Sequence, residues 1–89
     1  MNGRPEGHSR LVFDSPDGSV SFVLVRHTGG VNVERTKARL HGGRMSTAMR
    51  FPDEASFIQW CDTDRLRFTY PLLFEQLRRS GCALFTSSE

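Results

Sequence analysis

Hydrophobic and polar positions change their spacing near residue 52. Before it, short apolar runs alternate with turn residues, as is typical of strands; after it, apolar residues recur every three or four positions, as in helices. An apolar run at 10–14 is followed by the turn Ser15-Pro16-Asp17-Gly18 and by a return strand from Ser19 to Val25. The pattern predicts a β-hairpin.

A second hairpin is predicted between strands at 31–40 and 44–51. Gly42-Gly43 lies between them, and glycine accepts the positive φ that a two-residue hairpin turn requires. With that turn, Leu40 pairs with Met45, and apolar and basic residues separate to opposite faces. A shift of one residue would mix the two sets, so the pattern favours this register.

In this register the basic side chains of the second hairpin share one face. That face carries Arg35, Lys37, Arg39, His41, Arg44 and Arg50. Val31 and Val33 fall on it too, so we expect a bulge or strand bend near Val33.

The last third of the chain predicts two helices. The first begins at Pro52-Asp53 and ends before Asp64, and the second begins at Tyr70-Pro71 and stops at Gly81, leaving 82–85 for a short closing strand. The order β-β-β-β-α-α, with or without that last strand, indicates an α+β fold. Its antiparallel sheet of two hairpins would carry both helices on one face.

A chain of 89 residues is long enough for one small domain. We assign residues 10–85 to it and expect 1–9 and 86–89 to be flexible termini. The first residues are polar and no apolar run approaches a membrane span, which favours a cytoplasmic protein without a membrane partner.

Residues that carry catalysis or bind metals are not clustered in the sequence. Two cysteines, Cys61 and Cys82, are too few for a disulfide framework and favour reduced thiols, and the three histidines are scattered. No motif positions a nucleophile or cradles a phosphate. We therefore expect a protein that is not an enzyme and that has no catalytic residue, metal site, cofactor or small-molecule substrate.

Charge is concentrated on the second hairpin. Residues 26–50 hold six Lys or Arg and one acid, whereas 51–64 hold four acids and no base. Two antiparallel strands can enter a DNA major groove and direct basic side chains at phosphates or guanine edges. The first hypothesis is a binding module for DNA or another polyanion. Its candidate residues are Arg35, Lys37, Arg39, Arg44 and Arg50. The alternative is that these basic residues form a solvated sheet face without a binding role.

The second hypothesis is a protein-interaction or adaptor domain that binds an acidic protein or a second copy of itself. The stretch 22–25 is apolar without alternation, which is typical of a strand covered on both faces and would suit a homodimer interface. Val23 in that stretch and Trp60 in the first helix are the candidate contact residues. Most aromatic residues are expected in the core.

Overall fold

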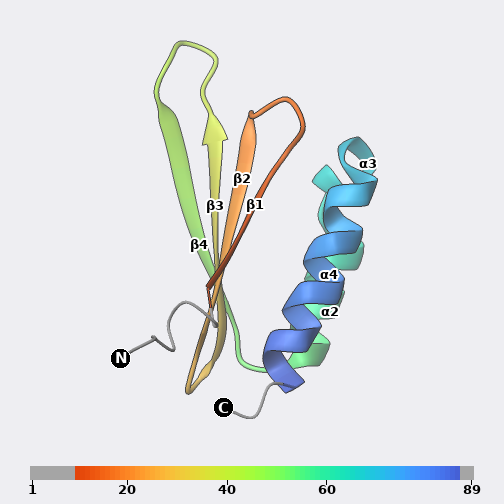
Figure 1. Ribbon diagram of the computed structural model, residues 1–89. Coiled ribbons are helices and arrows are strands. Elements are labelled where there is room, and N and C mark those ends of the chain that lie inside the picture. The colour runs from red at the N-terminus through yellow and green to blue at the C-terminus, as the bar shows by residue number, and fades with distance from the viewer. Residues whose placement is uncertain (1–9, 87–89) are drawn as a thin grey trace, which may run out of the picture.

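The computed structural model describes residues 10–86, which form one antiparallel sheet with helices against one face (Figure 1). The strands are β1 Arg10–Asp14, β2 Val20–His27, β3 Gly30–Ala38 and β4 Arg44–Phe51, and they lie side by side in chain order. The helices are α2 Glu54–Thr63, α3 Leu66–Thr69 and α4 Pro71–Thr86. This confirms the predicted α+β class and element order. The expected flexible segment 1–9 lies outside the described residues, as do 87–89.

The core lies between the sheet and the helices. Every second residue of β2 is buried, beginning at Val20, and Val31 and Val33 of β3 are fully buried beside them. Aromatic side chains from α2 and α4 complete this layer, with the Phe22 ring edge-on to that of Phe74 at 5.5 Å between centroids. This confirms the expectation that most aromatic residues belong to the core, which lies on the inner face of the sheet.

Both long helices begin where the sequence predicts. The Asp53 carboxylate accepts a hydrogen bond from the Ser56 N–H at 2.8 Å and caps α2, and α4 starts at Pro71. The predicted stop at Gly81 and the closing strand at 82–85 are wrong, because α4 continues to Thr86. Gly81 is buried against the Phe57 ring, and a Cβ would overlap that ring. Gly81 thus allows close helix packing and does not end the helix.

The predicted register of the second hairpin is also wrong. Ala38 pairs with Arg44, Thr36 with Ser46 and Glu34 with Ala48, in place of the pairing set by a two-residue turn. The connection is a five-residue loop at 39–43, closed by a hydrogen bond from the Arg39 N–H to the Gly43 carbonyl. Burial of the β3 valines overrides the charge pattern of the hairpin, because that burial removes apolar surface from water.

The observed register places Val31 and Val33 in the core without any bulge in the β3–β4 ladder. The predicted bulge near Val33 is therefore wrong as well. Since successive residues of a strand point to opposite faces, Arg35 and Lys37 follow the valines onto the helix-covered face, while Arg44 and Arg50 lie on the other. The basic side chains of the hairpin do not share one face.

The second face of the sheet, which we call the outer face, is not covered by any described helix or strand (Figure 1). Val23 and Val25 of β2 are half-buried there, next to Val12 of β1, which is 52% exposed. The apolar stretch 22–25 predicted a strand covered on both faces. Within residues 10–86, only the helix-side face of β2 is covered. Each helix within residues 10–86 is too short or too polar to span a lipid bilayer.

Asp17 fastens the β1–β2 turn to the helical layer. Its carboxylate accepts hydrogen bonds from Ser15 Oγ at 2.7 Å, from Ser19 Oγ at 2.8 Å and from the Tyr70 hydroxyl at 2.9 Å. These bonds, that from Ser15 foremost, hold the pKa of Asp17 far below its ordinary value. The turn is thereby tied to the residue that precedes α4.

We expect Asp17→Asn to flatten the acid side of the stability profile. A carboxyl with a lowered pKa in the folded state stabilises the fold above its unfolded pKa, about 4, and loses that contribution as the pH falls below it. Urea unfolding between about pH 7 and pH 2 should show a smaller loss of stability in the variant than in the wild type. Parallel curves would contradict the role given to Asp17.

Candidate functional site

The longest exposed stretch within residues 10–86 is the end of the β3–β4 hairpin. All residues from Lys37 to Ala48, which we call the distal ribbon, are exposed, and Leu40 at its tip is 94% exposed. The ribbon carries Lys37, Arg39, Arg44 and His41 and has no acidic residue. In Figure 1 the β3–β4 connection extends beyond the β1–β2 connection. A protruding, cationic two-stranded segment is therefore available to a partner.

Arg35 does not belong to this surface. Its guanidinium forms an ion pair with Asp64 at 3.1 Å, and the two side chains are only 23% and 14% exposed. The same carboxylate oxygen accepts the Trp60 indole N–H at 3.0 Å, and the other oxygen accepts the Leu66 N–H at 2.9 Å. Asp64 thus joins β3, the end of α2 and the start of α3. Arg35 is a structural residue in this network.

The other four predicted basic residues are divided among three places. Lys37 lies at the uncovered end of the inner face, Arg39 in the loop, and Arg44 and Arg50 at the two ends of β4 on the outer face. Arg50 also approaches His27, with 3.4 Å between its guanidinium and Nδ1 of that ring. The distal ribbon therefore brings together Lys37, Arg39 and Arg44, with Arg50 six residues further along the same strand.

β4 offers more than charge, because it is an edge strand of the sheet. Seven of its eight residues are exposed or half-buried, and only Phe51 is buried. Met45 on the helix side is 52% exposed, since the helices do not cover this end of the strand. Towards Arg44 the strand thus presents two uncovered faces, and one edge of its backbone is unpaired within the described residues. Sequence reasoning missed this feature, although the run of small residues at 46–48 between longer side chains could have indicated it.

The contact residues of the second hypothesis have different environments. Trp60 packs among aromatic rings, with 5.5 Å between its ring centroid and those of Phe51 and of Phe74, and its N–H is bonded to Asp64. It packs α2 against the sheet and is partly buried. Val23 lies on the uncovered outer face, directly opposite Val12.

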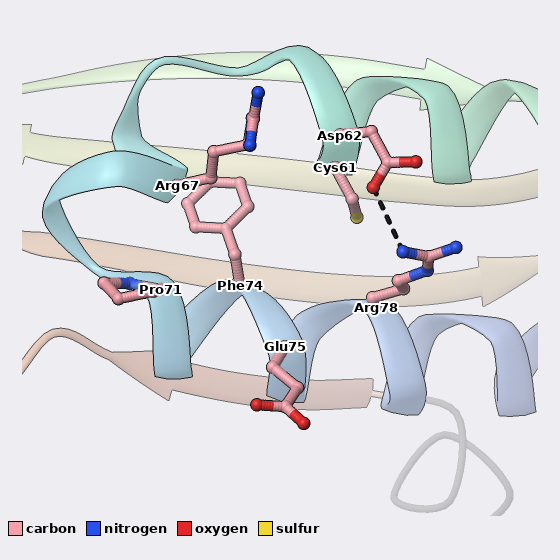
Figure 2. Close-up of a pocket in the computed structure, with 7 residues that line it drawn as sticks. All are labelled: Cys61, Asp62, Arg67, Pro71, Phe74, Glu75 and Arg78. Carbon is pink, nitrogen blue, oxygen red and sulfur yellow. Dashed lines mark hydrogen bonds and ion pairs between the residues drawn. The ribbon is translucent and has the colours of Figure 1, made fainter.

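A cavity of about 230 Å³ lies between α2, α3 and α4 (Figure 2). Its wall includes Cys61, Arg67 and Phe74, and an ion pair between Asp62 and Arg78 at 3.1 Å closes one side. That pair neutralises its own charges, whereas the buried Nε of Arg67 in the same wall has no hydrogen-bond partner among the described residues. Glu75 extends away from the other labelled side chains (Figure 2).

The thiol in this cavity is poorly suited to nucleophilic chemistry. Burial raises the pKa of the Cys61 thiol to about 12, and burial also raises the pKa of Cys82. Both cysteines are free. Within residues 10–86, no group of three or more His, Cys, Asp or Glu side chains could hold a metal ion.

We expect Arg35→Ala and Arg39→Ala to differ in stability. The first leaves the largely buried Asp64 carboxylate without its cation and should cost about 1–3 kcal/mol, whereas the second truncates an exposed loop side chain and should change stability by less than about 0.5 kcal/mol. Urea unfolding of the two variants measures both. Equal effects would contradict the structural role of Arg35.

We expect Cys61 to resist alkylation in the folded protein. At about pH 8, the raised pKa lowers the thiolate fraction on the order of 1,000-fold relative to an ordinary thiol. Iodoacetamide labelling of a Cys82→Ser variant, followed by mass spectrometry with and without urea, isolates this thiol. Rapid labelling without urea would show that Cys61 is accessible and ionised.

Comparisons with known proteins do not add to this geometry. No protein-family model, curated protein or solved structure matches the chain. Function is therefore inferred from the distal ribbon and the open β4 edge themselves.

Proposed function

We propose that this protein is a non-enzymatic interaction module that binds an acidic protein partner through the distal ribbon. The observation that carries the proposal is the run of twelve consecutive exposed residues, 37–48, which includes three Lys or Arg and no acid. A protein partner is favoured because the ribbon combines these charges with exposed apolar side chains at Leu40 and Met45. The cytoplasmic location expected from the polar first residues stays a prediction.

Electrostatics supports an anionic partner in particular. The three ion pairs formed within the described residues use Arg35, Arg78 and Arg79, and none uses a cation of the ribbon. Several uncompensated like charges on one protruding segment steer anionic partners and repel cationic ones.

Duplex DNA is the second candidate, favoured by the two-stranded shape of the ribbon. A β-ribbon can enter the major groove, and Arg39 and Arg44 near the tip would reach phosphates or guanine edges. The register weakens this candidate, because Lys37 and Arg44 point to opposite faces and Arg35 is withdrawn into an ion pair. A flat basic face is therefore absent from the described hairpin, and only the tip remains for a groove.

Fluorescence anisotropy with labelled poly-glutamate and with a duplex of about 20 base pairs tests both candidates at low and moderate salt. We expect poly-glutamate to bind at low salt, and Arg39→Ala with Arg44→Ala to weaken it at least about tenfold. Arg78→Ala with Arg79→Ala is the matched control, since it removes two cations from α4, and it should leave binding unchanged. Binding of the duplex alone would favour the second candidate, and binding of neither probe would exclude both.

A further inference from the structure

β4 has its unpaired backbone groups in a regular row. The Arg39 N–H bonds to the Gly43 carbonyl, and the Ala38 N–H bonds to Ser19 on the other side of β3. Because hydrogen-bonded and non-bonded pairs alternate in an antiparallel ladder, the odd-numbered residues of β4 bond to β3. The N–H and C=O groups that face the open edge belong to Arg44, Ser46, Ala48 and Arg50.

This edge has few of the usual protections against another strand. β4 is eight residues long, contains no proline and pairs with β3 without interruption, whereas the opposite edge strand, β1, has five residues. No charged side chain of its central residues, 45–49, points into the sheet. The charged residues of β4 that can discourage pairing with another strand are Arg44 and Arg50. Because their charge is positive, they repel a basic strand and attract an acidic one.

The two arginines act against self-pairing. If two copies paired antiparallel over residues 44–50 of β4, Arg44 of each copy would lie opposite Arg50 of the other. Like charges directly opposite on neighbouring strands destabilise the ladder, whereas opposite charges stabilise it. An extended segment with acidic side chains at these two positions is therefore preferred over a second copy. Arg50 is exposed, and its 3.4 Å contact with His27 is long enough to yield to a carboxylate.

The inner side of β4 sets the rest of the pattern. Met45 is half exposed and Met49 is partly buried, and both lie on the face that the helices only partly cover. Residues of an added strand opposite these methionines would cover them with apolar side chains. Ser46 and Ala48, between the arginines on the outer face, are small and would not obstruct neighbouring side chains.

We propose that β4 accepts an extended segment of the partner as a fifth strand, with acidic residues opposite Arg44 and Arg50 and apolar residues opposite Met45 and Met49. This inference rests on the proposed function and specifies its binding mode. The added strand is amphipathic, with two acids six positions apart and two apolar residues immediately inside them. Backbone hydrogen bonds would supply affinity, and the two charge pairs would supply selectivity.

The experiment uses the full chain and a labelled peptide with the central sequence Glu-Val-Thr-Thr-Thr-Val-Glu. One control peptide has lysine at both ends. The other keeps both glutamates but has proline at its third position, opposite Ala48, where the peptide N–H would bond to β4. We expect each control to bind at least about fivefold more weakly than the parent peptide in fluorescence anisotropy.

Protein variants make the test specific to the edge. Arg44→Glu with Arg50→Glu should reverse the preference, so that the lysine peptide binds better, and Arg10→Glu on the far edge strand should not change it. Ala48→Pro should abolish peptide binding and preserve the fold, because the lost N–H faces the open edge. Circular dichroism checks the fold. Hydrogen exchange should slow at the four outward amides when the parent peptide binds.

The outcomes separate this inference from the proposed function. Equal binding of the parent and proline peptides would overturn strand addition, while poly-glutamate binding would still support an acidic partner. Failure of both probes would overturn both proposals. A dimer in light scattering that Ala48→Pro abolishes would assign the edge to a second copy. If only the DNA duplex bound, and Arg44→Glu with Arg50→Glu abolished that binding, the β4 edge would be assigned to DNA.

Discussion

Burial of Val31 and Val33 beneath the helices is the constraint on which the proposed binding surface depends. Side chains alternate along a strand, so two buried valines determine the direction of every other side chain in β3 and, through pairing, in β4. Burying each valine contributes about 1.5–3 kcal/mol, whereas separating exposed charges between two wet faces contributes little. The register therefore follows the burial of the valines. As a consequence, the basic side chains of the hairpin are divided between the two faces of the sheet.

A second consequence is that Arg35 and Arg44 have different environments. Because Arg35 is two residues beyond Val33, it points toward the helices and meets Asp64, which is already bonded to Trp60. An arginine that sequence reasoning placed in solvent thereby connects the sheet to two helices. Arg44, on the neighbouring strand and the other face, has no such partner among the described residues, and its charge stays available to a binding partner.

The helical layer leaves one side of the sheet open. Gly81 lets α4 approach the Phe57 ring of α2, and aromatic rings of both helices pack against the sheet at Phe22 of β2 and, from α2, at Phe51 of β4. The far end of β4 lies beyond their reach and keeps both faces and one edge in water. Open edges are usually blocked, and the two arginines at the ends of β4 are the charged side chains on which the proposed preference for acidic strands rests.

The local signals in the sequence determined most of the fold. Turn residues around Asp17, the cap at Asp53 and the proline at 71 predict four strands and two long helices, since each signal acts on its own neighbours. Tertiary packing decided the rest. Whether Gly81 ends a helix depends on the ring packed against it, and the hairpin register depends on which residues the helices cover. The basic residues were identifiable from composition, but their grouping required the register, because a shift by an odd number of residues exchanges the two faces of a strand.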